Sequence, residues 1–423
     1  FFDLSEGQIK DTEEYRTTFE LFIFEQYFAR RQLEEAIDYA HNLGLFVCYT
    51  QPFFRAIGGV DVKLYCELFS SGKGPYRKEV DGREVDCPYY QGAEASQPEQ
   101  VWWDLAQWDL TKLKEKDYRS YLEPIIYFIR EIGFDGILLD ALHYGYTQEG
   151  GLYEEIAETF ANDNILVIPE NLGCWGQEVN DKSRALGFVP LANPGFRTPA
   201  LRSLIEGIKA SEAYFCLSST HDVERIPSLY RALFKGGTLD KDIAKFIHTI
   251  YGLFSPYFGV FAGDEFGSDC RINNPGTKHP WKGPAFWDNP QFDLRGYIQR
   301  INLLRKRHPF LNYRISDEIP LPLKTDYDTR EEHEVLAYSI TNSSEKIIIL
   351  INLSGDEKQG KVFVSWDKFG SELSKARVEV YDPIEDKVYS FRLGDNLYPD
   401  GGIYYALRPY QIHIWEIEDL FSR

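Results

Sequence analysis

Short apolar runs alternate with amphipathic stretches from the beginning of the chain to about residue 310. Apolar residues at helical spacing predict helices over residues 25–42, 118–132, 152–161, 198–209, 240–254 and 296–306. Between them, continuous apolar runs predict strands over residues 45–49, 136–140, 165–170, 214–218 and 257–263. Strands that are buried on both faces of a parallel sheet have this unbroken apolar character. The alternation therefore indicates an α/β fold.

Residues 56–103 interrupt this alternation. They contain short β-like pieces that are separated by glycine-rich turns such as Gly58-Gly59. Asp81-Gly82 lies between two polar β-like segments, residues 77–80 and 83–85, a pattern that is typical of a tight β-hairpin. These features predict a small inserted subdomain.

From about residue 320 the pattern changes to strict alternation of apolar and polar residues. Strands are predicted over residues 335–341, 346–352, 377–382, 387–393, 403–407 and 411–417. Many short strands of this kind indicate an all-β domain. The predicted organisation is an α/β domain formed by 1–55 and 104–318, an inserted subdomain at 56–103, and a C-terminal β-sandwich domain at 319–423.

Charge excludes several classes of partner. The chain has 423 residues, with 66 acidic against 46 basic side chains and a formal net charge of −20. Nucleic acids and anionic membrane surfaces both attract basic proteins, so neither is an expected partner. No apolar segment reaches the length of a transmembrane helix. The chain begins at Phe1, and the lack of a visible leader says nothing about export, so the localisation stays unknown.

The six cysteines show no metal-binding or redox spacing. Cys48 and Cys216 lie inside apolar strand runs and are predicted to be buried thiols. A disulfide between Cys66 and Cys87 is left open.

Three acidic residues, Asp140, Glu170 and Asp222, each follow one of the apolar strand runs. In a β/α barrel the catalytic groups come from the C-terminal ends of the strands. Carboxyls that converge at such a place suit glycosidic bond chemistry, which needs an acid together with a nucleophile or base. The competing interpretation is that each acid merely caps its strand.

The segments around these acids resemble glycoside hydrolase family 13, the α-amylase family. The resemblance is carried by Gly133–Tyr144, Val167–Glu170, Thr220–Arg225 and Phe261–Gly267, in that order. Phe2–Glu6, followed by Arg16-Thr-Thr-Phe19, resembles the loop after the family's second barrel strand, so the resemblance covers most of the chain. It implies a (β/α)8 TIM-type barrel with an irregular insertion after the third strand and a C-terminal all-β sandwich domain.

The resemblance also implies catalytic roles. Asp140 would be the nucleophile, Glu170 the acid/base with a raised pKa, and Asp222 the residue that holds sugar hydroxyls in the transition state, with His221 as a further sugar contact. Two carboxyls about 5 Å apart favour a covalent glycosyl intermediate and retention. The expected substrate is an α-linked glucan or oligosaccharide, and hydrolysis and transglycosylation remain open.

Four further residues are candidates for substrate binding. His143 and Tyr144 follow the nucleophile segment and would line the acceptor side, with loop packing as the equal alternative. Trp103 would stack on a sugar ring, although packing is the commoner role for a tryptophan. Arg55 would return a positive charge to the site, and Arg225 is expected to pair with a nearby acid.

The chain departs from the family pattern at several positions. The family has an Arg two residues before the nucleophile and an Asp in its third strand, where this chain has Leu138 and Thr50. These positions are neighbours in the family's barrel, so the pair is interpreted as replaced together, which avoids one unpaired buried charge. Phe54 stands where the family has a calcium-binding Asn, so no cofactor or metal, including the structural calcium, is expected.

The family's first two barrel strands have no counterpart before residue 45. The remaining six do not close an eight-stranded barrel, and we expect that residues upstream of Phe1 exist.

Two other functions are compatible with the sequence. A non-catalytic carbohydrate-binding relative would explain the loss of the Arg and the Asp, although all three acids are retained. A phosphorylase that uses phosphate as acceptor would need further cationic groups, for which Arg55 is the obvious candidate.

Overall fold

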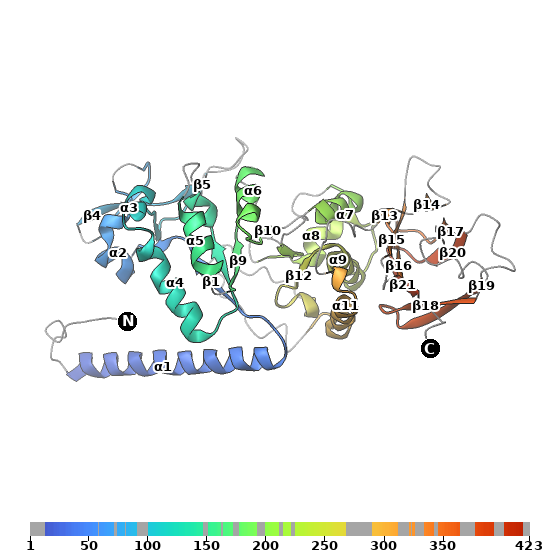
Figure 1. Cartoon of the computed structure of the whole chain (residues 1–423), viewed down its shortest axis with the longest axis horizontal. Coiled ribbons are helices and arrows are strands. Elements are labelled where there is room, and N and C mark those ends of the chain that lie inside the picture. Colours follow the sequence, from blue (N-terminus) through green and yellow to red (C-terminus); the bar gives the residue numbers. More distant parts are fainter. Residues whose placement is uncertain are drawn as a thin grey trace. The chain divides into compact units, whose positions relative to one another are not determined.

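The structure is a computed structural model of the chain (Figure 1). It describes residues 13–57, 59–71, 74–80, 82–90, 100–146, 151–161, 164–171, 177–192, 199–210, 215–220, 225–267, 290–311, 321–322, 324–325, 334–341, 346–363, 377–392 and 402–417. The chain divides into two compact units, Phe1–Pro190 and Leu191–Arg423, here called unit 1 and unit 2. No helix in the described ranges is long and apolar enough to cross a membrane.

Unit 1 is built on a parallel sheet with the strand order β1-β8-β9. Its strands are β1 (Cys48–Pro52), β8 (Gly136–Asp140) and β9 (Leu166–Pro169). Gly136 is needed in β8 because a Cβ there would lie 2.7 Å from the Cys48 sulfur and 2.9 Å from the Leu166 carbonyl oxygen. A side chain at this position would therefore collide with both neighbouring strands.

The helices of unit 1 are α1 (Glu13–Asn42), α2 (Val60–Leu64), α3 (Leu110–Glu115), α4 (Arg119–Ile132), α5 (Leu152–Ala161) and α6 (Gln177–Ala185) within the described ranges. Both α1 and α3 contact α4, and α5 contacts β9 (Figure 1). Ile137 and Leu139 of β8 are fully buried in one apolar cluster with Ile125 and Ile129 of α4. The prediction of a helix that packs on an apolar strand is thus confirmed for this part of the chain.

The inserted region contains η2 (Cys66–Leu68) and the short strands β2 (Arg55–Ala56), β3 (Arg77–Val80), β4 (Arg83–Asp86), β5 (Tyr89–Tyr90), β6 (Gln100–Val101) and β7 (Leu105–Ala106). The predicted hairpin is confirmed as β3–β4, with Gly82 in the left-handed region at φ +78°. Cys66 and Cys87 are free thiols, so the disulfide left open above does not form. Of the two predicted buried thiols, Cys216 is buried, but Cys48 is exposed and that prediction was wrong.

The first part of unit 2 is a second parallel sheet with the order β10-β11-β12. Its strands are β10 (Leu191–Ala192), β11 (Phe215–Leu217) and β12 (Tyr257–Gly259). The helical elements are α7 (Leu201–Ala210), α8 (Ile226–Tyr230), η4 (Arg231–Leu233), α9 (Asp240–Phe254), η5 (Asp264–Phe266), α11 (Arg295–Arg307) and η6 (Pro309–Leu311). Helix α9 is buried along most of its length, which makes it the centre of this core.

The C-terminal part of unit 2 is antiparallel, as predicted. One sheet has the order β13-β15-β16-β21-β18-β19, formed by Leu321–Pro322, Val335–Thr341, Lys346–Asn352, Ile412–Ile417, Arg377–Asp382 and Lys387–Arg392. The other has the order β14-β17-β20, formed by Lys324–Thr325, Lys358–Phe363 and Gly402–Leu407. Buried side chains of both sheets form one cluster, the arrangement of a β-sandwich.

Closure of the predicted eight-stranded barrel is not detected. Within the described ranges, the parallel strands form two separate three-stranded sheets, and strand pairing joins neither β9 to β10 nor β12 to β1. One face of β1, formed by Cys48, Thr50 and Pro52, is exposed in unit 1. The α/β class is therefore confirmed, while the closed (β/α)8 barrel is not.

Candidate active site

Asp140 lies at the C-terminal end of β8, in register with Pro52 of β1. Its backbone oxygen accepts a hydrogen bond from the Phe53 amide at 2.9 Å. Its side chain is half-buried, and within the described residues its carboxylate makes no hydrogen bond or ion pair.

Glu170 follows β9 and is held at three points by the end of β8 and the segment that follows it. Its amide donates to the Leu139 oxygen at 3.0 Å, and its carboxylate accepts from the Ala141 amide at 3.0 Å. Its backbone oxygen lies 3.1 Å from Nδ1 of His143. Glu170 is buried, with 7% of its surface exposed, so these bonds fix it firmly. The residue after one predicted catalytic acid thus binds the other.

The Ala141 backbone is unusual. It has φ +56° and ψ +24°, the left-handed conformation, which costs a residue with a Cβ about 1–2 kcal/mol. This turn directs the Ala141 amide toward Glu170, and it begins η3 (Leu142–Gly145). Strained backbone of this kind is concentrated at functional sites.

His143 and Tyr144 lie in η3, next to the Glu170 backbone. Burial lowers the pKa of His143, against the opposing effects of the Glu170 carbonyl and the charge of Asp140, so the imidazole is neutral near pH 7. The ring of Tyr144 contacts His143 at 4.4 Å, Phe54 at 5.1 Å and Trp102 at 6.0 Å between centroids. Trp102, which was not among the predicted site residues, therefore packs against this cluster.

Trp103 lies elsewhere in the inserted region. Its side chain is 53% exposed, and its ring meets Tyr76 edge to face at 5.6 Å. Trp102 and Trp103 are adjacent residues of the same type, so the sequence does not distinguish them. Only the structure shows that their neighbours differ.

Arg55 and Asp140 both affect the pKa of one buried phenol, that of Tyr121. The Arg55 guanidinium lies 5.6 Å from the Tyr121 ring centroid and 5.7 Å from that of Trp108, and it donates to the Pro52 oxygen at 2.9 Å. Burial raises the pKa of Tyr121 well above its usual range, Arg55 opposes this rise, and Asp140 adds to it. Arg55 and Asp140 thus both influence Tyr121, and a role of Arg55 as the positive charge of the site stays a prediction.

The two positions at which the resemblance would place an Arg and an Asp are adjacent. Thr50 of β1 and Leu138 of β8 are direct partners in the parallel register, so the predicted adjacency is confirmed. Phe54, at the position of the family's calcium-binding Asn, is buried between Phe53 and Tyr144. A ring offers calcium no oxygen ligand. No group of three or more His, Cys, Asp or Glu within the described residues has metal-binding geometry.

His221 and Asp222 lie outside the described residues. Two described residues that flank 221–224, Ser219 and Arg225, both contact one carboxylate, that of Asp264 in η5. The Ser219 hydroxyl donates to Asp264 Oδ2, and Arg225 Nε lies 3.2 Å from Asp264 Oδ1. The expected pairing of Arg225 with an acid is therefore confirmed, and the pair is almost completely buried.

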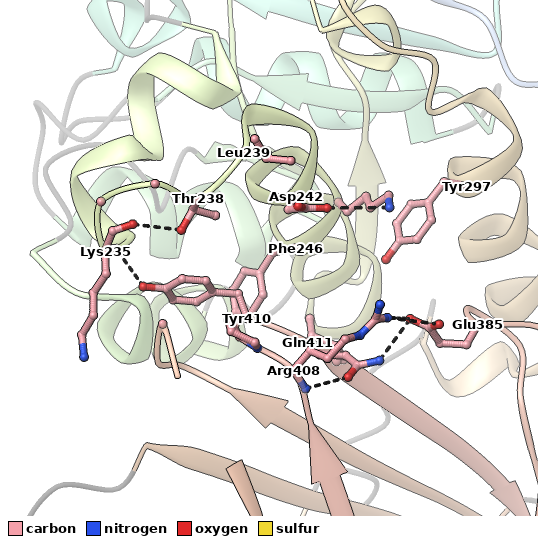
Figure 2. A pocket seen from close by; sticks show the side chains of 16 residues that line it. Lys235, Thr238, Leu239, Asp242, Phe246, Tyr297, Glu385, Arg408, Tyr410 and Gln411 are labelled. Atoms are coloured by element: carbon pink, nitrogen blue, oxygen red, sulfur yellow. Dashed lines mark hydrogen bonds and ion pairs between the residues drawn. The ribbon is translucent and has the colours of Figure 1, made fainter. Parts of the chain in front are cut away.

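A cavity of about 490 Å³ lies within unit 2, between the beginning of α9 and loops of the β-domain (Figure 2). The charges in its lining are paired, since Arg408 binds Glu385 and Lys245 lies 3.8 Å from Asp242. The Tyr410 hydroxyl accepts from the Lys235 amide (Figure 2). None of the predicted site residues lines this cavity, and the bond between Lys235 and Tyr410 links the loop before α9 to the β-domain.

Comparison with known proteins shows the fold. The chain is similar to the α-amylase of Geobacillus thermoleovorans complexed with acarbose, with a TM-score of 0.64 and 14% identity over 92% of this chain and 81% of that one. The debranching enzyme of Nostoc punctiforme gives a TM-score of 0.60 and 14% identity over 90% and 78%. The α-amylase of H. orenii gives 0.59 and 13% over 92% and 84%. No protein-family model and no curated protein matches the chain.

Proposed function

We propose that the chain is a retaining glycoside hydrolase or transglycosylase that acts on α-linked glucans or oligosaccharides. The observation that carries the proposal is the hydrogen bond between the amide of Ala141 and the carboxylate of Glu170. It joins the residue after Asp140 to the second acid, which supports a single site containing both carboxyls. The likeness to α-amylases and a debranching enzyme supports the substrate class.

In the proposed reaction Asp140 attacks the anomeric carbon while Glu170 gives its proton to the leaving glycosidic oxygen. The products of this step are a covalent glycosyl ester on Asp140 and a free sugar. Glu170, now ionised, removes a proton from water or from an acceptor hydroxyl, whose oxygen attacks the ester and releases Asp140. Asp222 would bind sugar hydroxyls more tightly in the transition state than in the ground state.

The surrounding residues have supporting roles in this proposal. The Ala141 amide and the His143 ring hold Glu170 in place. Because the imidazole of His143 is neutral, it adds no positive charge that would keep Glu170 ionised before the first step. Tyr144 and Trp102 would form an aromatic wall beside the acid.

The test is release of reducing sugar from maltooligosaccharides and of nitrophenol from a nitrophenyl α-maltoside. Asp140→Asn and Glu170→Gln are each expected to lower kcat by about 10³-fold or more, because each removes a group that reacts. The matched control is Glu84→Gln, since Glu84 is exposed on β4 and pairs with Arg77. NMR of the first product distinguishes retention from inversion. Full activity of Asp140→Asn would reject the proposal.

A non-catalytic carbohydrate-binding protein is the second candidate, and one observation favours it. Thr50 and Leu138 are neutral neighbours where the family has an ion pair beside the nucleophile. This candidate predicts that the wild-type chain binds maltooligosaccharides in calorimetry without any turnover.

A further inference from the structure

Unit 2 contains a buried polar cluster at the ends of β11 and β12. Asp264 is 2% exposed and Arg225 is 1% exposed, which is far below the exposure usual for charged side chains. The carboxylate receives the Ser219 hydroxyl on Oδ2 and the Arg225 guanidinium at 3.2 Å on Oδ1. Arg225 also donates to the backbone oxygen of Ala262 and lies over the Phe261 ring at 4.6 Å.

These contacts all reach one short turn. Residues 261–266, which follow β12, supply the carboxylate, the carbonyl and the ring, while Ser219 and Arg225 come from the connection after β11. The Tyr230 hydroxyl of α8 adds a hydrogen bond to the Ser218 oxygen at 2.8 Å and lies 2.9 Å from the Tyr251 hydroxyl of α9. Both ends of this connection are thus tied to buried groups of the same unit.

We propose that Asp264 is a positioning residue, whose single carboxylate fixes both ends of the segment that carries His221 and Asp222. The sequence separation makes this effective: Ser219 and Arg225 are six positions apart, with both candidate residues between them. In this proposal, holding Ser219 and Arg225 at one carboxylate reduces the conformational freedom of the chain between them before a substrate arrives. Preorganisation of this kind contributes to rate, because small errors in placement of a reacting group are costly.

The chemistry of the cluster fits a positioning role better than a catalytic one. Both charges are almost completely buried, and Asp264 Oδ1 has no hydrogen bond within the described residues apart from its ion pair. Burial raises the pKa of Asp264 to about 6, with Arg225 and Ser219 opposing the rise and Glu265 adding to it. A substrate does not reach such a group, so its effect must pass through the residues that it holds.

The inference rests on the proposed function for its kinetic consequence but not for its structural one. Two variants remove contacts of Asp264, with different risks to folding. Ser219→Ala removes one hydrogen bond, and the double variant Arg225→Leu with Asp264→Leu removes both buried charges together. Asp382→Asn is the matched control, because Asp382 is a buried carboxylate in the β-domain of the same unit that binds His413 at 2.7 Å.

Hydrogen exchange followed by mass spectrometry directly measures how strongly the contacts of Asp264 restrain the neighbouring backbone. In the double variant, amides in a peptide covering residues 215–226 are expected to exchange at least tenfold faster, and in Ser219→Ala about threefold faster, while amides of α9 and β16 keep their rates. Asp382→Asn should leave this peptide unchanged. Unchanged exchange in the double variant, or faster exchange throughout unit 2, overturns the inference.

Kinetics then separates the two proposals. If the wild-type chain is active, the double variant should show at least a tenfold lower kcat with KM within twofold, whereas Asp382→Asn should keep its kcat. Faster local exchange with an unchanged kcat overturns the positioning role. A wild-type chain without activity rejects the proposed function, and the exchange result still decides whether Asp264 anchors the segment.

Discussion

In unit 1 the ends of β8 and β9, which carry Asp140 and Glu170, are joined by hydrogen bonds from backbone groups. In unit 2 the segments that follow β11 and β12 are joined by a buried ion pair. Glu170 is held by the Ala141 amide and the Leu139 oxygen, and no cation pairs with Asp140 among the described residues. In unit 2, Arg225 and Asp264 form the joint. The strand ends are therefore held by different interactions in the two units, hydrogen bonds from backbone groups in unit 1 and an ion pair in unit 2.

The difference shows what each joint tolerates. A buried ion pair needs both members, because removal of one leaves an uncompensated charge in the interior. In unit 1 the neutral residues Thr50 and Leu138 are register partners at the positions where the resemblance to the α-amylase family would place an ion pair. The joint of unit 1 uses the backbone groups of Leu139 and Ala141, so it is insensitive to side-chain identity at these two positions except through the strain at Ala141, but one of its bonds needs the carboxylate of Glu170.

The largest effect is expected from breaking the joint of unit 2. Arg225→Met leaves Asp264 buried without its cation and should lower the free energy of unfolding of unit 2 by about 3–5 kcal/mol. The double variant Arg225→Leu with Asp264→Leu should recover most of that loss. Chemical denaturation of the three proteins measures both effects. If the single variant is as stable as the double one, the ion pair does not have the importance assigned to it.

The next effect concerns pH and the buried histidine of unit 2. His248 of α9 is fully buried, and within the described residues neither ring nitrogen has a hydrogen bond. Burial lowers its pKa to about 4 from 6.5, so the unfolded state binds more protons between these values. The stability contribution of His248 should fall by about 3 kcal/mol as pH drops from 6.5 to 4. Asp264, with its raised pKa, acts in the opposite direction over an overlapping range.

His248→Phe isolates this effect, since the rest of unit 2 is unchanged. Denaturation of wild type and variant at several pH values should show that the difference between them shifts in favour of the variant as pH falls. A difference that is independent of pH would mean that His248 is not desolvated.

A smaller effect is expected from restoring the family's charges in unit 1. Leu138→Arg should lower the free energy of unfolding by about 1–3 kcal/mol, because the introduced guanidinium would be half-buried with no carboxylate beside it at Thr50. Adding Thr50→Asp should recover part of this cost, since the two positions are register partners. Thermal melting of the single and double variants tests the coupling, and an unchanged melting temperature for Leu138→Arg contradicts the placement.

The smallest effect is expected at Ala141. Ala141→Gly relieves the left-handed strain but increases the freedom of the unfolded chain, which leaves a gain of about 0.5 kcal/mol. Because the backbone amide remains, activity should be retained. Loss of activity in this stable variant would show that the Cβ of Ala141, and not only its amide, supports the site.

Much of the local structure could be predicted from the sequence. The helix 240–254 and the strands 335–341, 346–352 and 377–382 occur with the predicted bounds. Their patterns are long and periodic, so local burial decides them. Strand β10 was missed because its two residues carry no pattern, and Cys48 was predicted to be buried because apolar character does not show which face of β1 is covered.

The sequence by itself determined the order of elements, the α/β and all-β regions, and the candidate acids at strand ends, because periodicity and residue chemistry are local properties. Only the tertiary structure decided that Ala141 binds Glu170, that Thr50 faces Leu138 and that Arg225 and Ser219 share Asp264. These contacts join residues that are 29 positions apart, as for Ala141 and Glu170, to 88 positions apart, as for Thr50 and Leu138. They depend on strand register and backbone conformation, which no local pattern encodes.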